Sequence, residues 1–254
     1  MTKMEYKDCS ILRNIGIPED RIHKTAVICG NLGRFKVFAR YGTKYKEYKK
    51  FSSYGAAELE VEGQMILIVC HGVSASSMGP ILRELIEMGV KNIIRGGTCG
   101  TYKPKIHKAG DIFICYASIR DDTTSISEIN VRYPAVADYD VIDALMDSSK
   151  ELEIQTFVGI DYTSDLFYRR TCKYDHRDLF SDYGLVDTED LELATLFVVS
   201  SLYGAKAGAI LTVDGCPREW WSGNYHAGKE VVNEGVDKMA RVALKAAAEI
   251  NKKF

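Results

Sequence analysis

HGVSASSMGPILRELIEMGVKNIIRGGTCGT, residues 71–101, is the stretch that decides the fold. An apolar run at 65–69 precedes it and predicts a buried strand, and the small residues at 72–77 then allow the backbone to approach a ligand closely. Apolar residues recur on one face over 81–88 and predict a helix that ends at Gly89. A second strand is expected over 92–94. The order strand, helix, strand predicts a right-handed parallel unit whose ligand crevice lies at the carboxyl ends of its strands.

Arg95 follows the second of these strands and leads into the glycine-rich run GGTCG at 96–100. A guanidinium at the end of a buried strand, followed by glycines, brings a positive charge and free backbone N–H groups to one point. Oxyanions are bound by such arrangements. The run therefore predicts an anion site around Arg95, Gly96 and Gly97.

Length and composition restrict the class of protein. The chain has 254 residues, of which 46% are hydrophobic and 27% charged, and this fits a soluble chain with a sizeable core. The formal net charge of −2 gives no electrostatic case for nucleic acid binding. No apolar run is long enough to predict a membrane span, and the first ten residues lack the apolar core of a signal peptide. A cytoplasmic location is therefore expected.

Cysteine and histidine spacing argues against a metal. The seven cysteines show no CxxC spacing, and the five histidines show no HxH or HExxH pattern. An odd number of cysteines without a framework also argues against a disulfide scaffold. We expect no metal site.

Strand-like and helix-like segments alternate along the whole chain. Strands are expected at 25–29, 110–117, 154–160 and 207–213, and a hairpin pairs 56–62 with 65–70. Helices are expected at 138–152, 187–203 and 229–252, and the stretches 118–130 and 169–183 read as irregular. This order predicts an α/β fold, one domain over 1–254 with a central mixed β-sheet flanked by helices.

Four polar segments follow predicted strands, at the edge where such a sheet binds ligands. They are Gly30–Arg34, Arg95–Gly100, Thr163–Tyr168 and Asp214–Pro217. Two arginines among them suit a phosphate-sized anion, although Arg34 alone also fits an ordinary turn. Phe167 stacks on a flat ring or belongs to the core, and Asp214 is a catalytic acid or a turn-forming Asp-Gly.

Glu192 is the most informative carboxylate. It lies between leucines inside the predicted helix 187–203, which is apolar nearly all round and therefore buried. A buried carboxylate must be paired or bound to something, and a ribose diol can donate two hydrogen bonds to it. The alternative is a glutamate near a helix N-terminus, stabilised by the helix dipole.

Five segments in this order resemble the nucleoside phosphorylase-I family, and in particular its compact, hexamer-forming purine nucleoside phosphorylases from bacteria and protozoa. They are Gly30/Arg34, IIRGGTCG at 93–100, SDLFY at 164–168, ELAT at 192–195 and VDGCP at 213–217. The resemblance covers nearly the whole chain. It implies a pentosyltransferase of purine salvage that converts nucleoside and phosphate into free base and ribose 1-phosphate.

The resemblance also implies roles for individual residues. Those that would hold inorganic phosphate, a co-substrate, are Gly30, Arg34, Arg95 and Thr98, with Gly96 and Gly97 in the same run. Those that would hold the nucleoside are Cys99, Gly100, Phe167, Asp190, Leu191, Glu192 and Trp220, with Asn14 contributed by a neighbouring subunit. Asp214 would protonate purine N7 as general acid. The resemblance implies no organic cofactor or metal. It implies a homo-oligomer, a hexamer built as a trimer of dimers.

Three positions depart from the family pattern. Ser52 occupies the place of an arginine that reaches the neighbouring phosphate, with Lys49 or Lys50 as possible substitutes, and Asn14 occupies the place of a histidine. Ser74 replaces a glycine of the HGxG turn. Because of these departures, a weakly active or degenerate nucleoside-binding paralogue is an alternative hypothesis.

Two other activities of the family are also considered. A uridine phosphorylase is the nearest enzymatic alternative, because Thr98 is compatible with it, but the stretch 169–173 lacks the expected glutamine. A nucleosidase that uses water would leave both Arg34 and Arg95 without an anion to hold.

Overall fold

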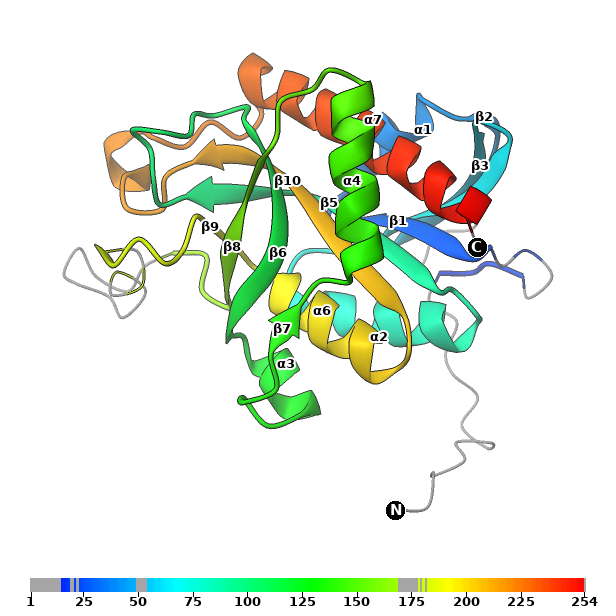
Figure 1. Ribbon diagram of the computed structural model, residues 1–254, viewed down its shortest axis with the longest axis horizontal. Coiled ribbons are helices and arrows are strands. Elements are labelled where there is room, and N and C mark those ends of the chain that lie inside the picture. The colour runs from blue at the N-terminus through cyan, green and yellow to red at the C-terminus, as the bar shows by residue number, and fades with distance from the viewer. Residues whose placement is uncertain are drawn as a thin grey trace.

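The computed structural model describes residues 15–18, 21, 23–48, 54–168, 178, 180 and 182–253. These residues form an α/β fold in which one mixed sheet carries helices on both faces (Figure 1). The strands are β1 (Thr25–Cys29), β2 (Thr43–Glu47), β3 (Gly55–Val61), β4 (Gln64–Cys70), β5 (Asn92–Thr101), β6 (Ile112–Asp121), β7 (Ala135–Val136), β8 (Phe157–Ser164), β9 (Thr188–Asp190) and β10 (Lys206–Gly215). The helices are α1 (Leu32–Ala39), α2 (Ala75–Glu87), α3 (Thr123–Glu128), α4 (Tyr139–Glu151), α6 (Leu193–Leu202), α7 (Glu230–Lys253) and the 3-10 turn η2 (Trp220–Ser222).

The centre of the sheet is parallel. β1 lies between β4 and β5, and β5 pairs in parallel with β10 on its other side. β3 and β2 extend the β4 edge in antiparallel pairing. The predicted βαβ unit, β4–α2–β5, is therefore confirmed, as is the hairpin of β3 and β4.

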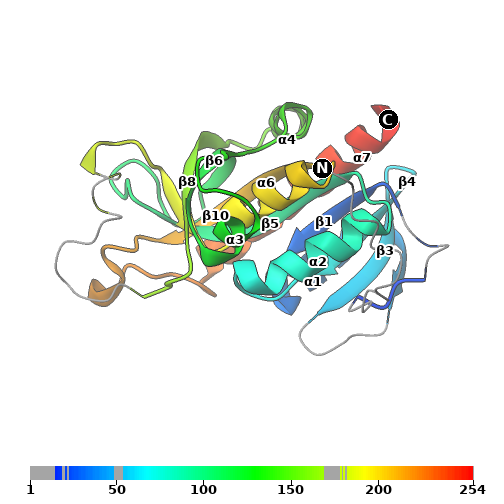
Figure 2. The same cartoon turned by 90° about the horizontal axis from the view of Figure 1, so that it is seen from below.

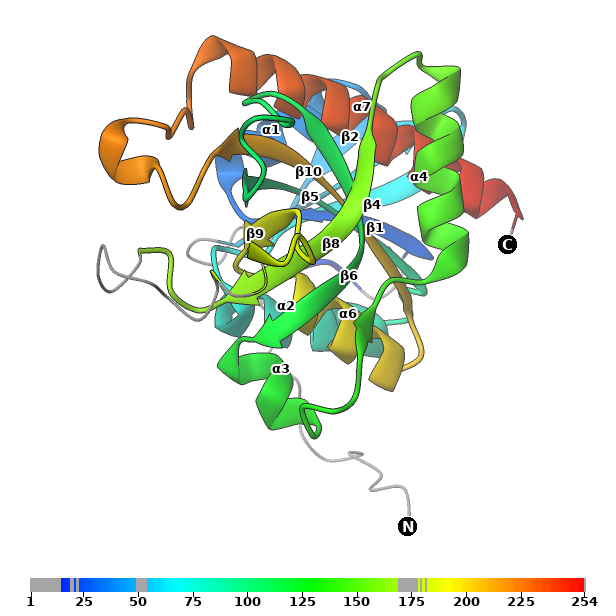
Figure 3. The ribbon, with the colours of Figure 1, turned by 60° about the vertical axis from the view of Figure 1, so that its left-hand side comes forward.

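The opposite end of the sheet closes on itself. β10 pairs with β6, β6 with β8, β8 with β9, and β9 with β5, which pairs again with β10. Figure 3 brings β6, β8 and β9 of this closed ring to the front. Side chains that point into the ring are removed from solvent. Polar groups there must therefore find hydrogen-bond partners within the ring.

Side-chain alternation along the central strands builds two cores. On β1, Ala26 and Ile28 pack with the helices α2 and α6, whereas Val27 packs with α1 and α7. Figure 2 shows α2 and α6 side by side on one face of the sheet. Strands buried on both faces read as continuous apolar runs, and this is why the sequence predicts them well.

Three sequence expectations are wrong in detail. Residues 118–130 are not irregular, because β6 continues to Asp121 and α3 follows. The expected helix over 187–203 is a short strand, β9, followed by α6, which begins only at Leu193. β5 continues to Thr101, so Arg95 lies within a strand and not at its end.

The last helix packs closely against the sheet through Gly235. A Cβ atom at this position would lie 2.6 Å from the backbone oxygen of Gly110 and 2.6 Å from Cγ2 of Thr212. A side chain there would push α7 away from β10. Among the described residues, no helix combines the length and the apolar character needed to cross a membrane.

We expect Gly235→Ala to lower the free energy of unfolding by roughly 1–2 kcal/mol, although alanine is the better helix former, because overpacking outweighs propensity. Urea denaturation measures this change. Glu234→Ala, at the exposed neighbouring position of the same helix, is the control and should stay within about 0.5 kcal/mol of the parent. A Gly235→Ala protein that is more stable than the parent would contradict the close packing.

Candidate active site

A cavity of about 480 Å³ opens at the carboxyl ends of β1, β5 and β10. Most of the residues that the sequence predicts for the site line it. They are Arg34, Arg95, Thr98, Cys99, Gly100, Phe167, Asp190, Leu191, Glu192, Asp214 and Trp220. Asn14 lies outside the described residues, as do Lys49, Lys50 and Ser52.

Arg34 enters the cavity from the first turn of α1. Asn31 caps this helix, and its Oδ1 accepts from the backbone N–H of Arg34 at 2.9 Å. The Arg34 guanidinium donates to Oγ1 of Thr98 at 2.8 Å, and its Nε has no hydrogen-bond partner within the described chain. Removal from solvent lowers the pKa of Arg34, and the positive charge of Arg95 lowers it further. An oxyanion bound here would therefore stabilise the Arg34 guanidinium, which is removed from solvent and lies near a second positive charge.

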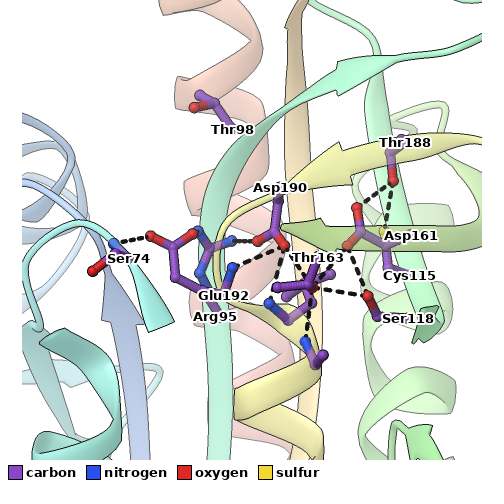
Figure 4. A network of polar contacts seen from close by, with 12 residues as sticks. Ser74, Arg95, Thr98, Cys115, Ser118, Asp161, Thr163, Thr188, Asp190 and Glu192 are labelled. Carbon is purple, nitrogen blue, oxygen red and sulfur yellow. Dashed lines mark hydrogen bonds and ion pairs between the residues drawn. The ribbon is translucent and has the colours of Figure 1, made fainter. Parts of the chain in front are cut away.

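Arg95 is almost completely buried, between two carboxylates (Figure 4). Its Nη1 lies 3.1 Å from Oδ2 of Asp190, and its Nη2 donates to Oε2 of Glu192. Burial alone would lower the pKa of Arg95, but the charges of Glu192 and Asp190 outweigh burial and raise it above its ordinary value. The guanidinium is thus held in place by ion pairs before any ligand binds.

Glu192 is the residue before α6, at the helix N-terminus that was the alternative interpretation, and not inside a buried helix. Its second oxygen, Oε1, accepts from the backbone N–H of Ser74 at 2.7 Å. Arg95 and Ser74 together offset the cost of burying this carboxylate. A carboxylate offers about four acceptor positions, so two positions remain for hydroxyl donors from the cavity.

Ser74 reaches Glu192 from a backbone conformation that favours glycine. Its φ of 87° and ψ of 155° lie in a region that L-residues rarely adopt. Ser74 lies in the turn between β4 and α2. In this conformation its backbone N–H points toward the carboxylate of Glu192. The sequence marked this position correctly as one where a glycine is customary.

Asp214 lies at the end of β10 and is 6% exposed. Burial raises its pKa to about 7, although Thr98 and the Arg34 guanidinium act in the opposite direction. Its Oδ1 has no hydrogen-bond partner within the described chain. A carboxyl group that titrates near neutrality and lines a cavity is suited to donate a proton.

Aromatic rings form the outer wall of the cavity. Phe167 and Trp220 are stacked, with ring centroids 4.6 Å apart and an interplanar angle of 21°. Tyr225 meets Trp220 edge-on at 5.4 Å and is held by a β-bridge to Gly215. The sequence analysis missed Tyr225, whose place in the tryptophan-bearing loop was the available signal.

The glycines of the predicted anion site do not form a loop. Gly96 and Gly97 pair with Ile210 and Leu211 of β10, and neither lines the cavity. A Cβ atom on Gly97 would lie 2.2 Å from Nη1 of Arg95, so this glycine makes room for the guanidinium. The interpretation as a nest of free N–H groups is wrong, because β5 continues through these residues.

Gly30 also lies behind the cavity and not on its surface. A Cβ atom there would lie 3.3 Å from Nη2 of Arg34. Its small size therefore serves the guanidinium. Whether Gly30, Gly96 or Gly97 contacts phosphate stays a prediction.

Two buried carboxylates near the site, Glu189 and Asp161, were not predicted, whereas Thr163 belongs to the predicted polar segment 163–168. Glu189 lines the cavity and accepts a hydrogen bond from the hydroxyl of Tyr102. Asp161 and Thr163 lie behind Asp190, within the ring of strands. The sequence offered only a weak signal, polar residues that alternate along β8. The described residues contain no cluster of three or more His, Cys, Asp or Glu side chains that could hold a metal ion.

The chain is similar in sequence and structure to a family of known proteins. The family model described as the phosphorylase superfamily matches residues 24–254. The chain belongs to the phosphorylase superfamily. It is 34% identical to the purine nucleoside phosphorylase of Plasmodium falciparum over 245 residues, which covers 96% of this chain and 99% of the relative. It is 26% identical to the uridine phosphorylase of Escherichia coli over 225 residues, which covers 84% of this chain and 83% of the relative.

Solved structures of superfamily members agree with this fold. The purine nucleoside phosphorylase of Toxoplasma gondii, solved in complex with immucillin-H, superposes with a TM-score of 0.89 at 29% identity, covering 95% of this chain and 98% of the other. The Plasmodium knowlesi homologue of the falciparum enzyme superposes with a TM-score of 0.82 at 31% identity over the whole of both chains. The predicted α/β fold with a mixed sheet is confirmed.

We expect Ser74→Gly to stabilise the protein by about 1 kcal/mol, because relief of the strained φ outweighs the greater freedom that glycine gives the unfolded chain. The N–H bond to Glu192 is kept. Ser76→Gly is the matched control, since it also removes the contact between the two serine hydroxyls but places glycine inside α2. It should cost about 0.5–1 kcal/mol. Equal losses for both variants in thermal melting would show that Ser74 is not strained.

Proposed function

We propose that the chain is a purine nucleoside phosphorylase, which cleaves inosine- and guanosine-type nucleosides with inorganic phosphate to give the free base and ribose 1-phosphate. One observation carries the proposal. The same cavity holds two arginines, a paired carboxylate with acceptor positions to spare, and a second carboxyl group whose pKa is about 7. The relatives from Plasmodium falciparum and Toxoplasma gondii, named as purine nucleoside phosphorylases, support it.

Phosphate binds between Arg34 and Thr98, with Arg95 behind them. Among the described residues, the guanidinium of Arg34 forms no ion pair with a carboxylate, and it matches two oxygens of a tetrahedral anion. Holding phosphate in line with the anomeric carbon makes the attack effectively unimolecular. The positive charges also stabilise the anion throughout the reaction.

The ribose lies against Glu192. Its 2′- and 3′-hydroxyls donate to the carboxylate oxygens, which Arg95 and Ser74 hold in a fixed orientation. Leu191 lies in the same cavity wall. A rigid acceptor of this kind orients the sugar toward phosphate as an oxocarbenium-like ribosyl group develops.

The base is placed at the aromatic end of the cavity, beside Phe167 and Trp220. Asp214 then donates its proton to purine N7 as the glycosidic bond breaks, so that the base leaves neutral and not as an anion. The raised pKa of Asp214 keeps a large share of the molecules protonated near neutral pH. A pyrimidine has no N7, and this favours purine over uridine as substrate.

The proposal extends to the state of the enzyme. It works as a homo-oligomer, a hexamer built as a trimer of dimers, in which Asn14 reaches the site of a neighbouring subunit. It acts in the cytoplasm without an organic cofactor or metal, and nucleic acid and membranes are not its partners. Oligomeric mass measured in solution tests the first of these statements.

The assay of purified protein with inosine tests the activity itself. We expect hypoxanthine and ribose 1-phosphate to appear only when phosphate is added. Release of hypoxanthine without phosphate would instead indicate a nucleosidase, turnover of uridine alone a uridine phosphorylase, and binding without turnover a degenerate paralogue.

Arg34→Lys should raise the phosphate KM roughly ten- to a hundredfold, because a charged hydrogen bond of about 1.5–3 kcal/mol is replaced by a point charge with poorer geometry. The inosine KM should change much less. Steady-state kinetics with each substrate varied in turn measures the two constants. Arg40→Lys, at the exposed end of the same helix, is the control and should leave both constants unchanged. An unchanged phosphate KM in Arg34→Lys would remove Arg34 from the anion site.

Asp214→Asn should lower turnover of inosine by at least roughly an order of magnitude, because a positioned acid contributes about 10²–10⁴-fold. In the parent enzyme, kcat/KM should fall as pH rises through about 7, since deprotonation removes the acid. Phosphate titrates in the same range, so the pH profile of Asp214→Asn, which retains that titration, is the control. Identical profiles for parent and variant would exclude Asp214 as the acid.

A further inference from the structure

A layer of buried hydroxyl and carboxyl groups lies behind Arg95, inside the ring formed by β5, β6, β8, β9 and β10 (Figure 4). Asp161, on β8, is completely buried in this layer. Its Oδ1 accepts from the Thr188 hydroxyl at 2.8 Å, and its Oδ2 lies 3.0 Å from Oγ of Ser118 and 3.2 Å from Oγ1 of Thr163. Within the described chain, no lysine, arginine or histidine forms an ion pair with it. A fully ionised Asp161 would therefore be a buried charge without a cation.

Thr163 connects this carboxyl group to the active site. Its Oγ1 accepts from the backbone N–H of Ala194 at 2.9 Å, and it also lies 2.8 Å from Oγ of Ser118 and 3.1 Å from Oδ1 of Asp190. The hydroxyl has one proton to give. If it donates to Asp190, it faces Asp161 with a lone pair.

The protons available do not satisfy these contacts when every carboxyl group is ionised. Ser118, Thr163 and Oδ2 of Asp161 are in mutual contact, and the only other proton among them is that of Ser118. One more proton, on Asp161, leaves only the contact between Ser118 and Thr163 without a hydrogen bond. Thr163 then accepts from Ala194 and from Asp161 and donates to Asp190, which uses its full capacity.

The charges point the same way. The carboxyl groups of Asp161, Asp190 and Glu192 all act on one guanidinium, that of Arg95, so full ionisation of the three leaves an excess of two negative charges around it. Burial raises the pKa of Asp161 well above its ordinary value and the charge of Asp190 raises it further, whereas the hydroxyls of Thr188 and Ser118 oppose the shift. A carboxyl group in this position keeps its proton.

We propose that Asp161 is a neutral carboxylic acid and a positioning residue for Arg95. Its proton begins a chain of hydrogen bonds with one direction, from Asp161 to Thr163 and from Thr163 to Asp190. Oδ1 of Asp190 is the acceptor at the end of this chain, and it also accepts the backbone N–H groups of Glu192 and Leu193 at 3.0 Å each.

The chain ends at the guanidinium of Arg95, which Oδ2 of Asp190 holds at 3.1 Å. Asp161 therefore acts on the anion site in two ways. It fixes the carboxylate that orients Arg95, and by staying neutral it keeps one negative charge away from the proposed phosphate. The first of these effects rests on structure alone, and only the second depends on the proposed function.

The titratable and charged groups that face Asp161 come from three strands: Asp190 on β9, Arg95 and Cys99 on β5, and Cys115 on β6. Between the unfolded pKa of about 3.9 and the higher folded pKa, the folded protein binds more protons at Asp161 than the unfolded chain does. Its contribution to stability is therefore fully present below about pH 3.9 and is lost as pH rises.

Two substitutions of Asp161 separate a neutral acid from an anion. Asp161→Asn keeps a donor for Thr163 and an acceptor for Thr188 without a charge, whereas Asp161→Leu keeps only the volume. We expect Asp161→Asn to leave the phosphate KM within about threefold of the parent. Asp161→Leu and Thr163→Val should raise the phosphate KM about tenfold with a smaller change in the inosine KM. Ser118→Ala, which contacts both residues but is not a link in the chain, is the control and should change neither.

Readouts that need no turnover decide the proton itself. The infrared difference spectrum of parent minus Asp161→Asn at neutral pH should show a protonated carboxyl band, since the contribution of Asp214, which is present in both proteins, cancels. The melting temperature of Asp161→Asn relative to the parent should rise between pH 5 and pH 8, because only the parent loses stability through this group. A missing band, a difference independent of pH, or an Asp161→Asn enzyme as impaired as Asp161→Leu would each overturn the proposal. If the protein proves not to be a phosphorylase, the spectrum and the melting curves still give the answer.

Discussion

The buried ion pairs of Arg95 are the interaction on which the rest of the site depends. A guanidinium removed from water costs several kcal/mol unless its partners are close and well oriented. Glu192 forms both an ion pair and a hydrogen bond with Arg95, and Asp190 forms an ion pair at 3.1 Å. Two backbone N–H groups hold Asp190, and the N–H of Ser74 holds Glu192. Three separate elements must therefore meet at one point, namely β5, the junction of β9 with α6, and the turn before α2. Breaking any one of them leaves a charge buried without its partner.

This requirement explains why the sheet closes on itself. Asp190 comes within reach of Arg95 because the short strand β9 pairs with β5 through Gly100 and Thr101. β8 pairs with the other edge of β9 and brings Thr163 behind Asp190. A helix over these residues would direct successive side chains around its axis. A strand directs Thr188 and Asp190 to the same face, into the ring.

The sequence predicts the parts of this arrangement that depend on chain order and apolar runs. Arg34 follows β1 and Arg95 lies within β5, and these two strands lie side by side, so the meeting of the two arginines in one cavity could be expected from the βαβ rule. The start of α6 could not be decided between the two interpretations of Glu192, because the apolar residues of this segment fit a longer helix equally well. The strand conformation of Gly96 was also not predicted, because glycine is a weak strand former. A glycine is present there because a Cβ atom would clash with the neighbouring ring of Phe38. Tertiary packing decided both.

The two arginines of the site differ in what a bound anion would add. Arg95 already forms ion pairs with two carboxylates, and their negative charges raise its pKa. Arg34 has a hydroxyl partner, Thr98, and its pKa is lowered by removal from solvent. An oxyanion therefore gains more from Arg34 than from Arg95. Under the proposed function, Arg34 gains more from phosphate, and Arg95, whose Nε and Nη1 have no hydrogen-bond partner within the described chain, adds a second contact that is already oriented.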